Sequence, residues 1–305
     1  MIEFFYCDKQ FEKFNGFYSD DNVFDRTRLF EKYGIFKDCE EISENILSCI
    51  KNAELKNKQY IVCFPCTNSL VKKINISIED IDSAGGYSYK KSIYNDIEKK
   101  FDEITIVLTE NDIKKYVIMH ELQHAKEDLE LRKKGKTIED VLTYYKYSAN
   151  LYDKSKTNIE KEITNILYYL TSFERNAFID SIYAEMRDNK KNFSNVQNAY
   201  GFIKNTEFYK SYENVLYNCN YFINLKDISL KKSVLENVNK KSNLNFKTYK
   251  DFRNWLKGKV TEYKNKFEKI IPKIAYSCFE QNMTKIISPP VNLSSHVKRI
   301  DEILN

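Results

Sequence analysis

The chain has 305 residues, of which 49 are basic and 44 acidic, and it contains only seven glycines and four prolines. This length can bury a large core without disulfides, and the scarcity of glycine and proline excludes collagen-like repeats and a fold made of many tight turns. The formal charge of +5 is small and mixed in sign, so it permits nucleic-acid binding without indicating it.

Residues 1–58 are expected to form a helical N-terminal segment. Apolar residues recur at intervals of three and four in residues 21–34 and 40–55, and Gly34 would end the first of these helices. Four segments rich in β-branched or aromatic residues follow, which are residues 59–64, 72–79, 85–92 and 102–110. They predict a small sheet of three or four strands, with Gly85-Gly86 supplying a turn.

After Glu110 the pattern becomes helical. Residues 111–135 are predicted to form one helix, with Asn111 or Asp112 able to cap its start and basic residues in its last turn before Gly135. Further helices are predicted at residues 139–153, 158–170, 172–188 and 250–271. Residues 189–305 are expected to be a mostly helical region interrupted by loops rich in Asn and Lys. We therefore expect a helix-dominated α+β fold.

Cysteine usage and the N-terminal residues favour a cytoplasmic protein. The seven cysteines are scattered and odd in number, which indicates reduced thiols, and Cys63 and Cys66 lie in a strand-like segment without the second CxxC pair of a structural zinc site. The residues MIEFFYCDKQFEKF lack the features of a secretory signal, and no run approaches the roughly 20 apolar residues that cross a bilayer. No membrane partner is expected.

Two of the three histidines lie four residues apart around a glutamate, in the segment His120-Glu121-Leu122-Gln123-His124. Residues four apart on a helix differ in direction by only about 40°, so both imidazoles can reach one metal ion. Glu121, beside the first histidine, can then take a proton from a water held by the metal. The apolar residues just before the motif favour a buried helix over a solvated one.

A catalytic zinc takes three protein ligands, so a third one is needed. One straight helix cannot supply it, and the glycine and third histidine of the metzincin pattern are replaced by glutamates. Glu174 is the candidate, because it lies on a mostly apolar helix face where an unpaired carboxylate would be unfavourable. Glu185, on the same face, and His296, near the C-terminus, remain alternatives. Thr171 and Glu174 also have the spacing of a capping box, in which Glu174 would serve only the helix start.

The segments HELQHA and FERNAF together resemble the gluzincin branch of the zincin metallopeptidases, and are similar to small HExxH peptidases of bacteria and their phages. The resemblance implies a zincin-like core over residues 59–188, with the small sheet packed on the HExxH helix. It implies Zn²⁺ as the cofactor, held by His120, His124 and Glu174, with Glu121 as the general base. A peptide or protein is the implied substrate.

The resemblance also assigns roles that this sequence fills incompletely. The strand at residues 102–110 would be an edge strand that pairs with extended substrate. Gluzincins have a histidine-orienting acid four residues after the glutamate ligand, but this position holds Phe178, so Asn176 or Asp180 would have to substitute. Tyr183 is one of many tyrosines that could stabilise an oxyanion, and could equally belong to the core.

Two other functions compete with a peptidase. A zinc-stabilised structural or interaction protein, such as a virion component, would keep the ligands, although it would have no need of Glu121. A nucleic-acid binder is suggested by residues 247–273, where basic and aromatic residues interleave, but the apolar residues there have helical spacing and predict a core face. The sequence does not indicate an oligomeric state.

Overall fold

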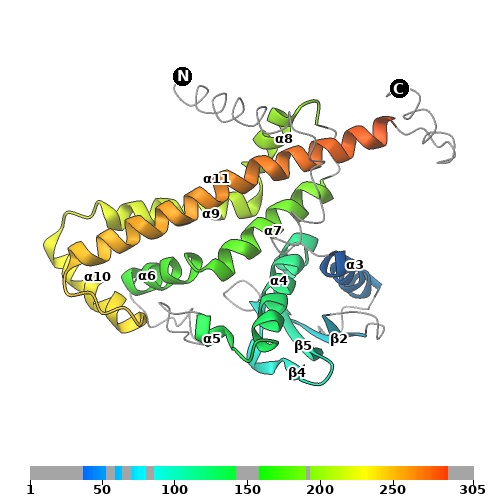
Figure 1. Ribbon diagram of the computed structural model, residues 1–305, viewed down its shortest axis with the longest axis horizontal. Helices are drawn as coiled ribbons and strands as arrows, with labels where there is room; N and C mark the ends of the chain where they lie inside the picture. The colour runs from blue at the N-terminus through cyan, green and yellow to red at the C-terminus, as the bar shows by residue number, and fades with distance from the viewer. Residues whose placement is uncertain are drawn as a thin grey trace.

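The computed structural model describes residues 37–52, 59–63, 70–79, 86–141, 158–189 and 193–287. Helices dominate these residues, and a small mixed sheet lies along the lower side of the molecule in the view of Figure 1. The helix-dominated α+β class is therefore confirmed. The predictions for residues 1–36, Cys66 and His296 lie outside the described residues, and the division of the chain into three regions stays a prediction.

The sheet is built around one central strand. Its strands are β1 (Gln59–Cys63), β2 (Val71–Ile78), β3 (Gly86–Tyr87), β4 (Ile93–Asn95) and β5 (Lys100–Leu108). β2 pairs with β5 in parallel, β3 and β4 pair with the other side of β5 in antiparallel fashion, and β1 lies antiparallel outside β2. Side chains on β2 and β5 alternate in burial, which places isoleucines of both strands in the core.

The prediction that residues 102–110 form an edge strand is wrong. β5 pairs on one side with β2 and on the other with β3, as at Tyr87 and Ile106, and with β4, as at Ile93 and Glu103. The sequence predicted one strand at residues 85–92, but only two residues of it form β3, and Tyr89–Lys91 form a 3-10 helix, η1. Among the described residues, β3 and β4 therefore lie along the outer edge on this side of the sheet.

Two helices cover one face of the sheet. These are α3 (Lys37–Asn52) and α4 (Lys115–Arg132), and their apolar residues join β2 and β5 in one hydrophobic cluster. Asn111 and Asp112 do not cap α4 as predicted, because they belong to a separate 3-10 helix, η2 (Glu110–Asp112). Gly135 does follow the end of α4, with the positive φ of 67° that glycine adopts readily.

α7 (Ser172–Asp188) crosses the other side of α4 in antiparallel fashion. Lys115 pairs with Asp188 at one end of the crossing, and His124 pairs with Glu174 toward the other. The remaining helices are α5 (Ile138–Val141), α6 (Asn158–Tyr169), α8 (Val196–Ile203), α9 (Glu207–Ile223), α10 (Ile228–Lys241) and α11 (Tyr249–Ile287). Figure 1 shows α7, α9 and α11 packed together beyond α4, where their apolar faces form a second cluster.

α11 is much longer than the helix predicted at residues 250–271, because it continues through Pro272. Its residues Phe252, Leu256, Tyr263 and Phe267 are buried, so the segment that interleaves aromatic and basic residues is a core face, as its spacing predicts. In the described part of the chain, no helix has both the length and the apolarity needed to cross a membrane.

Candidate metal centre

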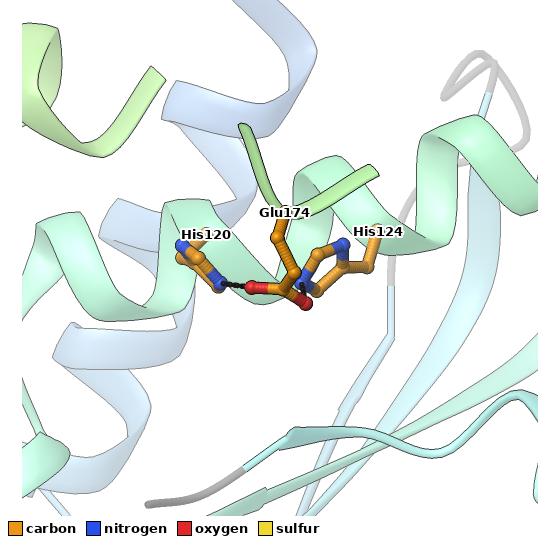
Figure 2. A group of neighbouring side chains, drawn as sticks. All are labelled: His120, His124 and Glu174. Carbon is orange, nitrogen blue, oxygen red and sulfur yellow. Dashed lines mark ion pairs between the residues drawn. The ribbon is translucent and has the colours of Figure 1, made fainter. Parts of the chain in front are cut away.

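His120, Glu121 and His124 lie on α4, and Glu174 lies in the first turn of α7, directly opposite (Figure 2). His120 Nε2 is 3.4 Å from Glu174 Oε2, and His124 Nε2 is 3.1 Å from Glu174 Oε1. The three side chains offer nitrogen and oxygen atoms that all lie within 4.8 Å of one another. Their exposed fractions are only 7%, 4% and 1% in chain order. This buried group could bind a metal ion.

The spacing of these atoms fits a tetrahedral site. Two ligand atoms that share a zinc ion at about 2.0–2.1 Å lie about 3.3 Å apart in tetrahedral geometry. The two histidine–carboxylate distances of 3.4 and 3.1 Å match this separation. Glu174 Oε1 is buried and receives no hydrogen bond within the described part of the chain. A cation between the imidazoles and the carboxylate would satisfy it, and two nitrogens with one oxygen form a set typical of zinc.

Ser181 determines which ring nitrogen of His120 carries a hydrogen. The Ser181 hydroxyl donates its hydrogen to the carbonyl oxygen of Ala177 at 2.8 Å, so its oxygen is left to accept from His120 Nδ1, at 3.2 Å. A neutral His120 therefore carries its hydrogen on Nδ1, which leaves the lone pair of Nε2 to bind a cation placed between His120 and Glu174. This is the tautomer that binds a metal through Nε2.

The first turn of α7 explains how Glu174 serves the site. The Thr171 side chain accepts a hydrogen bond from the Glu174 backbone N–H at 3.2 Å, so Thr171 caps α7 as the sequence suggests. The Glu174 carboxylate, however, turns toward the histidines. Burial opposes its ionisation, but His124 and His120 outweigh burial and hold the pKa of Glu174 well below the ordinary 4.5. Glu174 is therefore an anion in a buried site.

Glu121 lies beside the group and is 5% exposed. Its Oε2 accepts a hydrogen bond from the backbone N–H of Tyr87, on β3, at 2.6 Å. Burial is the largest influence and raises the pKa of Glu121 to about 7, with Glu174 adding to the rise and His120 and the Tyr87 N–H opposing it. A carboxyl group with a pKa near neutrality can both take and give a proton at the pH of a cell.

Aromatic rings surround the two histidines. Phe208, at the start of α9, stacks on His120 with ring centroids 4.9 Å apart, and Phe173 stacks on His124 at 4.1 Å. Phe178, four residues after Glu174, also packs here, with its ring centroid 5.7 Å from that of His120. Tyr168 lies near the site as well, and burial followed by the neighbouring Glu174 carboxylate raises the pKa of its phenol well above 10.0. These rings shield the site from solvent.

The structure does not bring the other predicted residues into the group. Glu185 Oε2 accepts from the backbone N–H of Glu207 at 2.9 Å, and Asn176 donates to Glu127 Oε1 at 2.7 Å. Asp180 and Tyr183 are buried, and neither carboxylate oxygen of Asp180 has a hydrogen-bond partner within the described part of the chain. Ser181 takes the orienting role instead. Its position two turns after Glu174, on the same helix face, is the one sequence signal for it.

Neither a protein-family model, a curated protein nor a solved structure matches this chain. The site is therefore defined by its own residues. Within the described part of the chain they form one buried group of two histidines and a carboxylate that could hold a metal ion, with a second carboxyl group alongside.

Proposed function

We propose that the chain is a zinc-dependent peptidase with a zincin-like core. His120, His124 and Glu174 hold the zinc, and Glu121 is the general base. The observation that carries the proposal is a group of three candidate ligands next to a carboxyl group whose pKa is near 7. A structural zinc site uses four protein ligands, whereas a catalytic site uses three and keeps a position open.

Zinc, when bound, would supply Lewis acidity, which polarises a peptide carbonyl and makes water a better proton donor. Glu121 takes the proton of the attacking water and delivers it to the leaving amine, and a pKa near 7 suits both transfers. The stacked rings of Phe208 and Phe173 keep His120 and His124 in place and exclude bulk water, which strengthens electrostatic interactions in the site.

Metal content is the first test. Elemental mass spectrometry on protein purified without chelators should find about one zinc per chain, and His120→Ala and Glu174→Ala should each lose it. Glu185→Ala is the matched control, because Glu185 lies on the same helix outside the group, and it should retain zinc. Zinc retained by Glu174→Ala would contradict the ligand set.

Glu121→Gln then tests the reaction. This variant should retain zinc but hydrolyse a mixed pool of fluorogenic peptides at a rate roughly 10²- to 10⁴-fold lower than the wild type, which is the usual contribution of a general base. Equal rates in the two proteins would contradict the role of Glu121.

The burial of the site favours a second candidate, a structural or interaction protein stabilised by zinc. His120, His124 and Glu174 are at most 7% exposed, and Glu121 is already bonded to Tyr87. In that case the wild type would bind zinc and gain stability from it, but would cleave no peptide of the pool, and Glu121→Gln would behave like the wild type in both respects.

A further inference from the structure

We infer that Tyr87 is a positioning residue for Glu121. The phenol hydroxyl of Tyr87 anchors β3 to α4 through Asp128, and this anchor places the Tyr87 backbone N–H against the Glu121 carboxylate. The inference rests on the proposed function for its catalytic meaning, but the contacts that carry it do not depend on zinc. It adds Tyr87 and Asp128, two residues outside the metal group, to the machinery of the site.

Tyr87 contacts α4 at two points. Its backbone N–H donates to Glu121 Oε2 at 2.6 Å, and its hydroxyl donates to Asp128 Oδ2 at 2.7 Å. Glu121 and Asp128 lie seven residues apart, so they share one helix face and are separated by about 10 Å along the helix axis. A single strand residue therefore spans two turns of the helix that carries the histidines.

Asp128, which accepts the hydrogen bond from the Tyr87 hydroxyl, is itself held firmly in place. Asp128 is completely buried, and its other oxygen, Oδ1, accepts from Arg132 Nε at 3.0 Å. The Arg132 guanidinium lies over the Phe101 ring, with 5.6 Å to the ring centroid, so β5 helps to hold it. Burial and the neighbouring Asp128 raise the pKa of the Tyr87 phenol well above its ordinary value, which keeps the hydroxyl protonated as a donor.

The sheet alone holds β3 weakly, because β3 has only two residues. The Ser88 N–H donates to the carbonyl oxygen of Thr105 on β5, so the alternation of the strand turns the Tyr87 N–H outward, toward Glu121. That N–H donates its hydrogen bond to Glu121 Oε2. In the described part of the chain no hydrogen bond reaches Oε1, which is left as the oxygen that can face a water. The anchor thus sets which oxygen of Glu121 works as the base.

Removing the hydroxyl alone tests the inference. Tyr87→Phe keeps the ring and the backbone N–H, and Asp128→Asn weakens the acceptor while the phenol stays. Tyr94→Phe is the matched control. Tyr94 lies on β4, which pairs with β5 as β3 does, and its buried hydroxyl makes no hydrogen bond in the described part of the chain. If Tyr87→Phe does not fold, Asp128→Asn provides the same comparison.

Amide hydrogen exchange at position 87, measured on zinc-free protein, reports the contact directly and needs no substrate. Both Tyr87→Phe and Asp128→Asn should speed exchange of this amide by about tenfold or more, because a strand edge without its anchor opens locally. Tyr94→Phe should leave the exchange rate unchanged. Exchange at the wild-type rate in Tyr87→Phe, or an equal acceleration in Tyr94→Phe, would overturn the inference.

Peptide hydrolysis by the zinc-loaded proteins provides the second readout. A misplaced base should lower kcat by about 10- to 100-fold while KM and zinc content stay within about twofold of the wild-type values. A fall in zinc content, or a change confined to KM, would contradict a positioning role. If the wild type cleaves no peptide, the proposed function fails, and the exchange rates still decide whether Tyr87 and Asp128 hold Glu121.

Discussion

His120 makes contacts on both ring nitrogens, and the one with Ser181 determines how it can bind a metal. The Ser181 oxygen accepts from Nδ1 because the Ser181 hydrogen is already donated to Ala177. Ser181→Ala should therefore lower zinc affinity by roughly 10- to 100-fold, which is the usual effect of losing a partner that orients a histidine ligand. Competition with a fluorescent chelator measures the affinity.

Ser43→Ala is the control for this prediction. Ser43 is a fully buried serine on α3 whose hydroxyl also donates to a carbonyl oxygen of its own helix, that of Glu40. It should show wild-type zinc affinity. Equal affinities in all three proteins would show that Ser181 does not orient His120.

Asp180 is 2% exposed, and within the described part of the chain neither of its oxygens has a hydrogen-bond partner. Burial, with Glu127 adding and Lys126 opposing, raises its pKa well above the ordinary 3.8. Asn cannot ionise, so Asp180→Asn should stabilise the zinc-free protein at pH 7 by at least about 1.4 kcal/mol, the equivalent of one unit of separation between the folded and unfolded pKa.

The raised pKa of Asp180 makes the stabilising effect of Asp180→Asn depend on pH. Between pH 3.8 and the higher folded-state pKa, the folded chain binds a proton at Asp180 that the unfolded chain has lost. Wild-type stability from this group therefore falls as the pH rises from about 4, and the advantage of Asp180→Asn should disappear below that pH. Urea unfolding at pH 4 and pH 7 provides the comparison. An advantage of the same size at both values would contradict the assignment.

The residues of the site differ in how visible they are in the sequence. His120, Glu121 and His124 follow from their spacing on one helix, because the geometry is local. Glu174 could be proposed as a ligand from its place on an apolar helix face, although a role in capping α7 was the competing interpretation. In the structure, Thr171 caps the helix and the Glu174 carboxylate faces the histidines. Tyr87 and Ser181 gave no comparable signal, since both act through contacts between elements far apart in the chain.

At the scale of elements, the start of α9 covers the metal group. Phe208 stacks on His120, and Glu207 beside it accepts from Lys114 Nζ and Tyr116 Oη, both at 2.8 Å. Phe208→Ala should open the site, so zinc should pass to excess EDTA several-fold faster than from the wild type, since local opening controls access to a buried site.

Phe202→Ala controls for the loss of an aromatic side chain. Phe202 is a partly buried residue of α8 that packs against Phe193. This variant should release zinc at the wild-type rate even where it lowers stability. Equal acceleration by both variants would mean that general loosening, and not the cover over His120, controls release.

Some elements were predicted closely from the sequence, and others were not. α6 and α7 begin and end within a residue of their predicted bounds because apolar spacing runs through several turns. β3 and β4 have two and three residues, too few to show alternation, and they were missed or merged. α11 passes through Pro272 against the usual rule, and the buried Ile270, Ile271 and Ile274 on either side show that packing holds the helix there.

At the scale of the whole molecule, the candidate metal-binding group of His120, His124 and Glu174 lies where the sheet cluster and the helical cluster meet. α4 contributes to the first cluster, α7 contributes mainly to the second, and the ligands join these two helices. Zinc at 100 times its dissociation constant should therefore stabilise the whole chain by about 2.7 kcal/mol, provided that the unfolded chain does not bind it.

Urea unfolding with and without zinc measures this stabilisation, with His120→Ala as the control that should show none. Because the ligands bridge the clusters, fluorescence and circular dichroism should follow one transition that shifts as a unit. A zinc effect confined to one of two separate transitions would show that the site stabilises only part of the molecule.

The distance along the chain between α4 and α7 also has a consequence for biosynthesis. At about 5 to 20 residues per second, a ribosome delivers α7 several seconds after α4. During that interval the nascent chain presents two imidazoles without the carboxylate, and two ligands retain zinc poorly. If the chain binds zinc as proposed, it should therefore acquire the metal late, after α7 has packed against α4 through burial of apolar side chains.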